Sequence, residues 1–262
     1  MKKLISLIKY NTTILFRDMN SILFAFLMPI GFYVLFGSML KNVETAGASM
    51  GELLVPLYTI IIIGNAVLNV FGSYYGQARE NGNLVKYKFL GINELMYAGS
   101  LYIATLIFQL LVIVSFLIFT RVYAGIVFPA AQLLPVMVML IVINLYQFAV
   151  SYFLNAIIRK SSLYNSVSLT FYMFQMFLGG LTFPLEMFPK FLREIIYIVN
   201  PIIYGRDALI DVWADHKSLA ETASNVWTLI AVSAGLLVVG SVINRLAQKS
   251  KTELPVSAVQ AG

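Results

Sequence analysis

The chain has 262 residues, of which 60% are hydrophobic and only 11% are charged. A soluble globular domain is about half apolar and about a quarter charged, so the excess of apolar side chains has to face lipid. The net charge of +6 comes from bases beside hydrophobic runs, which indicates membrane topology rather than nucleic-acid binding. The absence of cysteine excludes disulfides and thiolate metal sites.

Residues 1–18 are predicted to form an amphipathic helix that lies at the membrane surface. At helical spacing Leu4 and Leu7 share one side, and Lys2 and Lys9 lie opposite. Lysine stems reach the headgroup layer while the apolar face sinks below it. A solvated basic terminus is the simpler alternative, and it does not explain the apolar face.

Charge-free windows mark the predicted membrane spans, because a Lys, Arg or Asp at mid-bilayer costs about 2.5–3.5 kcal/mol. Each window holds the roughly 20 residues that a spanning helix needs. We therefore predict an all-α membrane protein with a single transmembrane domain over residues 1–262. The six predicted spans cover residues 20–40, 53–76, 96–119, 133–158, 162–183 and 224–244.

Lysine and arginine divide unevenly between the two sides of these spans. Most of the 18 bases lie in segments that share a side with both termini. Because bases collect in cytoplasmic loops, both termini are predicted to be cytoplasmic in a multi-pass protein of the plasma membrane.

One cytoplasmic connection, residues 77–91, reads QARENGNLVKYKFLG. Leu84 and Tyr87 begin a narrow apolar stripe beside Lys86 and Lys88, which predicts a short interfacial helix. Anchoring by positive charge is the simpler interpretation of the lysines. It does not explain the apolar side chains among them.

An external stretch, residues 179–204, reads GGLTFPLEMFPKFLREIIYIVNPIIY. Between Pro189 and Pro201 lies an amphipathic piece of about ten residues, or roughly 15 Å of helix, against a hydrocarbon core of about 30 Å. This piece cannot cross a membrane, so it lies in the interface or dips in and returns. An ordinary amphipathic loop helix is the alternative.

Both stretches resemble those of ATP-binding-cassette (ABC) type-2 export permeases. The cytoplasmic stretch departs from the family pattern at Asn83 and Gly91. It matches the pattern at Arg79, Glu80, Gly82, Leu84 and Leu90. The external stretch matches in the spacing of Phe183, Pro184, Glu186, Pro189, Asn200, Pro201 and Tyr204.

The resemblance implies that residues 79–91 form a coupling helix that docks on a separate ATPase subunit, and that residues 184–205 form a re-entrant hairpin before the last span. The matched external residues are then the candidate external gate. Residues 1–18 resemble the connecting helix of the family. The implied docking residues are Arg79, Glu80, Gly82, Leu84, Tyr87 and Leu90.

The sequence contains no P-loop, dinucleotide fingerprint, zinc-ligand spacing or nucleophile–base pair. No catalytic residue, metal or cofactor is therefore expected in this chain, and the resemblance places ATP and magnesium on the partner ATPase. The predicted spans carry no carboxylate, which disfavours transport coupled to protons or sodium.

Uncharged polar residues lie inside several spans. Hydrogen bonding between helices, worth about 0.6 kcal/mol per bond, is the simpler interpretation. The resemblance implies that the second and fifth spans line the pathway at a dimer interface. The candidate pathway residues are Asn65, Asn69, Ser168, Phe171 and Gln175.

The main hypothesis is a bacterial permease subunit that works as a homo- or heterodimer with ATPase subunits and contacts membrane lipids but no nucleic acid. Its expected substrate is a hydrophobic or amphipathic drug, lipid or peptide, moved out of the cytoplasm. One alternative is a permease for polysaccharides or lipid-linked glycans. Others are a self-sufficient secondary carrier or channel, and a membrane enzyme, which would need a reactive cluster.

Overall fold

The computed structural model describes residues 2–39, 44–45, 48–183, 185 and 188–252. Within these ranges the chain is helical, apart from an antiparallel pairing of the two-residue strands β1 (Glu44–Thr45) and β2 (Ala48–Ser49). The prediction of a helical fold is therefore confirmed.

The N-terminal half is built around one long, nearly unbroken helical rod. Helix α1 (Lys2–Leu15) is followed by α2 (Met19–Met39), which covers the first predicted span. The rod itself is formed by three consecutive segments: α3 (Met50–Gly64), the π-helical segment η1 (Asn65–Phe71) and α4 (Gly72–Glu80). A π-helical segment inside an α-helix widens the backbone locally and is frequent at functional sites.

The middle of the chain contributes three long helices to the bundle. The short helix α5 (Asn83–Phe89) leads into the long helix α6 (Glu94–Ala124). A 3₁₀ turn η2 (Ala130–Gln132) precedes α7 (Leu133–Ile157), and α8 (Ser161–Leu178) follows after a short connection.

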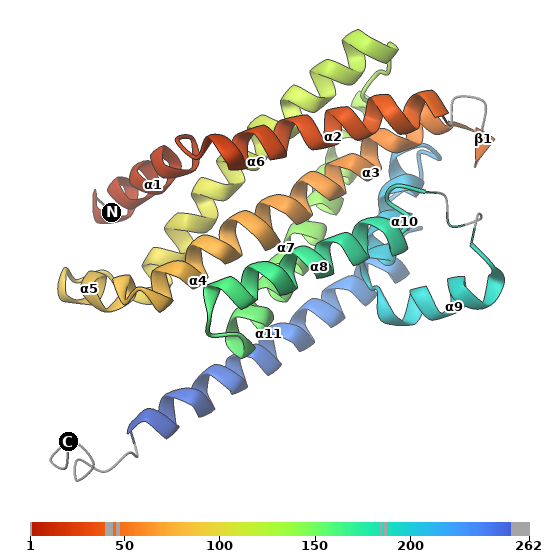
Figure 1. Cartoon of the computed structure of the whole chain (residues 1–262). Coiled ribbons are helices and arrows are strands. Elements are labelled where there is room, and N and C mark those ends of the chain that lie inside the picture. The colour runs from red at the N-terminus through yellow and green to blue at the C-terminus, as the bar shows by residue number, and fades with distance from the viewer. Residues whose placement is uncertain (1, 40–43, 46–47, 184, 186–187, 253–262) are drawn as a thin grey trace, which may run out of the picture.

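The C-terminal part contains α9 (Lys190–Val199), α10 (Ile202–Trp213) and the last span α11 (Ala223–Thr252). In Figure 1, α1, α5 and the far end of α11 lie at one end of the bundle, while β1 and α9 lie at the opposite end. The predicted coupling segment and the predicted external hairpin are therefore on opposite sides.

Within the described residues, five helical stretches are long and apolar enough to cross a membrane. Helix α8 falls outside this group, because its 18 residues include several serines, an asparagine and a glutamine. It also ends at Leu178, before the predicted boundary at residue 183, so a sixth span remains a prediction. The five stretches are Ile22–Met39, Gly51–Glu80, Glu94–Ala124, Ala130–Ile157 and Ala223–Ala247.

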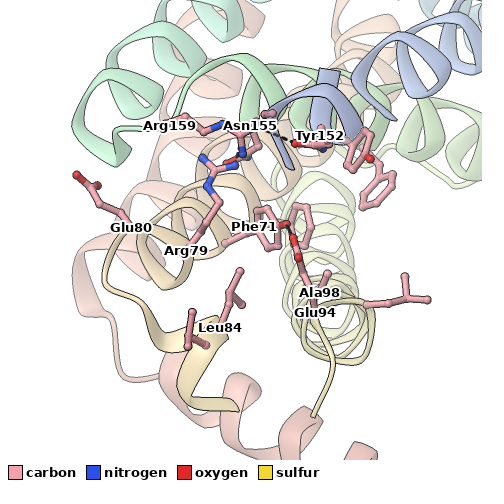
Figure 2. Close-up of a pocket in the computed structure, with 15 residues that line it drawn as sticks. Phe71, Arg79, Glu80, Leu84, Glu94, Ala98, Tyr152, Asn155 and Arg159 are labelled. Carbon is pink, nitrogen blue, oxygen red and sulfur yellow. Dashed lines mark hydrogen bonds between the residues drawn. The ribbon is translucent and has the colours of Figure 1, made fainter. Parts of the chain in front are cut away.

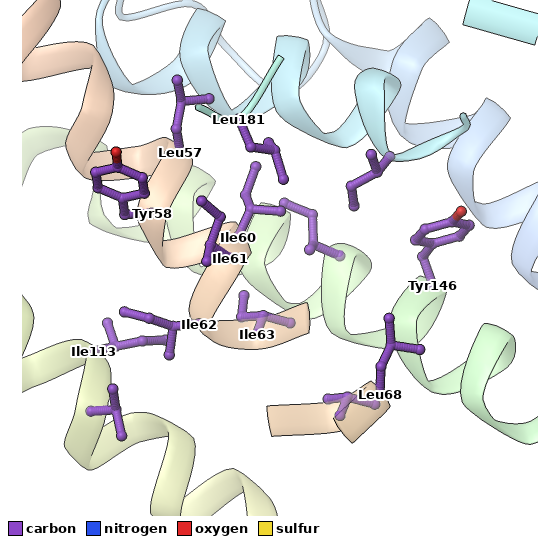
Figure 3. Packing of buried hydrophobic residues seen from close by; sticks show 14 of the residues in the cluster. Leu57, Tyr58, Ile60, Ile61, Ile62, Ile63, Leu68, Ile113, Tyr146 and Leu181 are labelled. Carbon is purple, nitrogen blue, oxygen red and sulfur yellow. The ribbon is translucent and has the colours of Figure 1, made fainter. Parts of the chain in front are cut away.

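The core surrounds α3, which packs against α2, α6, α7 and α10. Every residue from Leu53 to Ile63 is buried, as expected for a helix that is apolar on all sides. Figure 3 shows Ile60 to Ile63 of this helix directed toward its neighbours, with Tyr146 of α7 on the far side of the cluster. This packed rod is the element against which the other helices are positioned.

Candidate functional site

The predicted coupling segment, residues 79–91, begins with the end of α4 and continues as a separate seven-residue helix, α5. Gly82 precedes α5 with φ 68° and Gly91 follows it with φ 72°. Both angles lie in the left-handed region that glycine adopts at little cost. The two glycines therefore let the chain turn sharply out of α4 and back into α6.

The side chains of α5 and the residue after it divide into two faces. Leu84 and Tyr87 pack on the bundle, where the Tyr87 ring stacks on Tyr97 with 5.1 Å between centroids. On the other face Phe89 is 87% exposed and Leu90 is 64% exposed. We call this outer face the α5 tip, and it consists of Val85, Lys86, Lys88, Phe89 and Leu90.

The docking residues implied by the resemblance are therefore distributed over both faces. Of the six, only Leu90 belongs to the α5 tip, whereas Leu84 and Tyr87 face inward. The most exposed apolar side chain, Phe89, was not among them. The sequence feature that could have identified Phe89 as a docking residue is its position two residues after Tyr87, within the same apolar run.

Arg79 and Glu80, at the end of α4, hold the ends of two other helices. The Arg79 guanidinium donates hydrogen bonds to the carbonyls of Asn155 and Ile158, the latter at 2.7 Å, where α7 ends. The Glu80 carboxylate accepts hydrogen bonds from the hydroxyl and the backbone N–H of Ser161, the latter at 2.7 Å, where α8 begins. A cation at a helix C-terminus and an anion at a helix N-terminus both match the helix dipole. These two side chains thus fasten α4 to the connection between α7 and α8.

Helix α1 is joined to the same region. Its Lys3 ammonium donates to the Leu90 carbonyl at 3.0 Å, next to the α5 tip. Farther along α1, the buried Asn11 amide donates to the Ser100 hydroxyl of α6 at 2.9 Å. The surface helix, α5 and α6 are therefore linked by polar contacts as well as by packing.

The candidate pathway residues mostly form hydrogen bonds inside the bundle. In η1 the Asn69 amide donates to the Asn65 side-chain oxygen at 3.1 Å. Gln175 is buried and accepts from the Gln147 amide at 3.1 Å. Ser168 is also buried, and its hydroxyl donates to a carbonyl within its own helix. Of these contacts only the one between Gln147 and Gln175 joins two helices, and a role in lining the pathway stays a prediction.

Phe171 differs, because it lines an open apolar cavity of about 480 Å³ on the outer face of α8. The aromatic ring of Phe174 stacks beside it at 6.2 Å. The sequence analysis did not single out Ser166 and Thr170, two polar residues that lie four positions apart on this face. The cavity, which we call the α8 cavity, is lined by Ser166, Val167, Thr170, Phe171 and Phe174.

A largely buried ion pair, which the sequence analysis did not single out, lies beside the predicted external hairpin. Arg206 of α10 is 8% exposed and contacts Asp207 at 2.7 Å. Its Nε also donates to the carbonyl of Gly180, a residue with φ 65° just after α8. The Tyr197 hydroxyl of α9 donates to Asp207 at 2.7 Å, so one cluster joins α8, α9 and α10. Burial raises the pKa of Asp207, although the adjacent guanidinium lowers it.

Residues of the external motif lie around this cluster. Asn200 is fully buried between α9 and α10, and its amide nitrogen and oxygen have no hydrogen-bond partner in the described part of the chain. Pro201 immediately precedes α10. The Tyr204 ring packs edge-on against Tyr197 with 6.0 Å between centroids.

The first half of the motif is only partly described. The Phe183 ring packs edge-on against Phe36 of α2 at 5.1 Å, and Pro189 immediately precedes α9. Two candidate gate residues, Pro184 and Glu186, lie outside the described residues.

Helix α9 buries only a narrow part of its surface. Ile196 packs against Leu185 and Ile203, while Phe191 is 65% exposed and Ile198 is also exposed. An exposed apolar stripe on an amphipathic helix suits a lipid interface or a second protein surface.

Among the described residues, no group of three His, Cys, Asp or Glu side chains could hold a metal ion. A family model described as ABC-2 type transporter matches residues 2–213, from α1 to the end of α10. A comparison with curated proteins found no match to an individual protein.

Proposed function

Because the chain belongs to the ABC-2 type transporter family, we propose that it is the membrane permease subunit of an ATP-driven exporter whose ATPase binds the α5 tip. Members of this family are transport subunits and not themselves catalytic, and the family implies an ABC ATPase as partner. The observation that supports this proposal best is the exposed α5 tip directly next to Arg79 and Glu80.

The hydrogen bonds of α4 suggest how ATPase movement reaches the spans. A push on the α5 tip is passed to α4, and from there through Arg79 to the end of α7 and through Glu80 to the start of α8. Lys3 passes the same movement to α1. Because charged groups hold the helix ends, the connected elements move together rather than sliding past one another.

The α8 cavity supports the proposed class of substrate. Its aromatic and aliphatic walls carry only two hydroxyl groups, those of Ser166 and Thr170, and no charged residue. Such a surface suits a hydrophobic or amphipathic drug, lipid or peptide better than a polysaccharide. A second permease chain, identical or related, facing α8 would enclose this surface in a pathway between the two chains.

The hairpin of α9 and α10 is proposed to form the external gate of this pathway. Its exposed apolar stripe on α9 is held by shallow burial, so moving it breaks few contacts. The cluster of Arg206 and Asp207 is the pivot about which α9 turns.

Co-purification tests the docking proposal. The double variant F89A/L90A is expected to lower recovery of the partner ATPase about tenfold or more and to abolish export, because truncated apolar anchors weaken interfaces most. The control variant F191A removes an exposed phenylalanine at the opposite end of the bundle and should leave recovery of the ATPase unchanged. If F89A/L90A recovered as much ATPase as F191A and wild type do, docking at α5 would be refuted.

Site-directed labelling tests the orientation in the plasma membrane. The chain contains no cysteine, so V85C and I198C each introduce a single thiol at an exposed position. On intact cells a membrane-impermeant maleimide should label I198C, and it should label V85C only after the cells are opened. The reverse pattern would place α5 outside and remove the coupling proposal.

A further inference from the structure

A larger cavity of about 790 Å³ lies at the end of the bundle that carries α5 (Figure 2). Its lining comes from η1, α4, α5, α6, α7 and α11, and shares no residue with the α8 cavity. Binding sites for small molecules commonly measure about 300–1,000 Å³. This cavity is therefore large enough for a ligand and is separate from the proposed substrate pathway.

One wall carries two arginines that contact only neutral groups. Arg79 donates to backbone carbonyls, and Arg159 donates to the Asn244 side-chain oxygen at 3.2 Å. In the described part of the chain neither guanidinium lies within 4 Å of a carboxylate. A guanidinium has five N–H donors, so both retain free donors suited to a phosphate.

Two carboxylates, those of Glu80 and Glu94, also line the cavity, and they differ in their hydrogen bonds. The Glu80 carboxylate already accepts hydrogen bonds from the hydroxyl and the backbone N–H of Ser161. Glu94 stands at the start of α6, where it accepts the Tyr75 hydroxyl hydrogen and keeps acceptor capacity. Glu94 therefore places a negative charge across the cavity from the two arginines.

The remaining surface is apolar and continues toward lipid. Phe71 and Phe148 form the inner wall. Leu95 lies at the rim and is exposed, and farther along the same face of α6 Ile103 and Ile107 are exposed as well. Their spacing of eight and four residues makes a stripe along a membrane-spanning helix, which is a surface for acyl chains.

We propose that this cavity binds the headgroup of an ethanolamine phospholipid. The phosphate contacts Arg79 and Arg159, the primary ammonium contacts Glu94, and the acyl chains follow the α6 stripe. Because Leu84 of α5 forms part of the wall, the bound lipid braces the coupling helix against α6 and α7.

The test measures lipid retention by native mass spectrometry of the purified full-length chain, supplied with phosphatidylethanolamine, phosphatidylcholine or phosphatidylglycerol. Wild type should retain phosphatidylethanolamine about tenfold better than phosphatidylcholine, whose quaternary ammonium cannot donate a hydrogen bond. R159Q should retain all three lipids about tenfold less well. E94Q should lose preference for phosphatidylethanolamine and keep phosphatidylglycerol.

R121Q and E194Q are matched controls, because both residues are exposed and outside the cavity. They should retain each lipid as the wild type does, and all variants are compared at equal monodispersity. Glycerophosphoethanolamine, which has the headgroup without acyl chains, should not displace the lipid at equal concentration. The proposal would be overturned if this soluble headgroup displaced the lipid, or if wild type retained the three lipids equally. It would also be overturned if R159Q retained the lipids as wild type does, or if E94Q kept the preference for phosphatidylethanolamine.

Discussion

The two ends of the helix bundle are held together in different ways. At the α5 end, Arg79 and Glu80 form hydrogen bonds with the ends of α7 and α8. At the hairpin end, Arg206 and Asp207 pair with each other in a buried setting, and Asn200 is buried without a partner in the described part of the chain.

This difference has a physical consequence. Backbone groups at helix ends lack partners within the helix, so charged side chains that bind them stabilise both elements. A buried ion pair has to offset the desolvation of two charges, and an unpartnered amide is unfavourable by itself. This difference agrees with the proposed roles, in which the α5 end transmits force and the hairpin end changes position.

The largest effect is expected from breaking the hairpin ion pair. R206A leaves the partly buried Asp207 without its cation, and the free energy of unfolding should fall by about 2–3 kcal/mol. Thermal unfolding in detergent measures this loss. The pKa of Asp207 is raised in the folded state, so lowering the pH neutralises Asp207 in the folded protein before it does so in the unfolded chain. The stability difference between R206A and wild type should therefore become smaller at low pH.

The matched control for this prediction is K217A, which removes the more exposed pair between Lys217 and Asp211 at 2.7 Å. Because solvent screens this pair, the expected loss of stability is much smaller than that of R206A. Equal losses in R206A and K217A would show that the hairpin does not depend on its buried charges.

A smaller effect is expected where α4 approaches α8. A Cβ atom at Gly72 would overlap the Tyr164 hydroxyl, which bonds the Leu68 carbonyl and the Ser151 hydroxyl at 2.9 Å each. G72A should therefore lower the free energy of unfolding by about 2 kcal/mol through overpacking. G99A, in α6, meets no atom within 4 Å and should raise stability by up to about 1 kcal/mol. A stable G72A would contradict tight contact between these helices.

The smallest effect is expected from N200L, because Leu removes an amide that has no hydrogen-bond partner. Its stability should stay within about 1 kcal/mol of wild type. N11L is the comparison, since it breaks the buried bond to Ser100 and should lose about 1–2 kcal/mol. If N200L is stable but fails to export, Asn200 serves the movement of the hairpin; a loss as large as that of N11L would argue for a structural role.

Much of the helical layout was predictable. Helices α2 and α7 begin and end close to the limits of the charge-free windows, whereas α6 continues past Arg121 to Ala124. The predicted end of the fifth span was less accurate, because the charge-free run continues past Leu178 although two glycines end the helix there. Absence of charge marks what a bilayer tolerates, but it does not mark where a helix stops.

The partners of the charged residues were not predictable. Arg79 and Glu80 stood out in the sequence, yet their contacts depend on the α7–α8 connection, whose first partner Asn155 is 76 residues away. Arg206 and Asp207 did not stand out in the sequence, and it is the packing of α10 against α3, α7 and α11 that buries Arg206 and partly buries Asp207.

The sequence by itself determined that this is a helical membrane protein with a basic connection on one side and an amphipathic segment on the other. Composition and spacing suffice for that, because lipid excludes charge along whole segments. The tertiary structure decided which charges hold helix ends, which are buried in pairs and which face a cavity. Those outcomes depend on contacts between residues far apart in the chain. Such contacts are set by the packing of the helices and cannot be read from a local stretch of sequence.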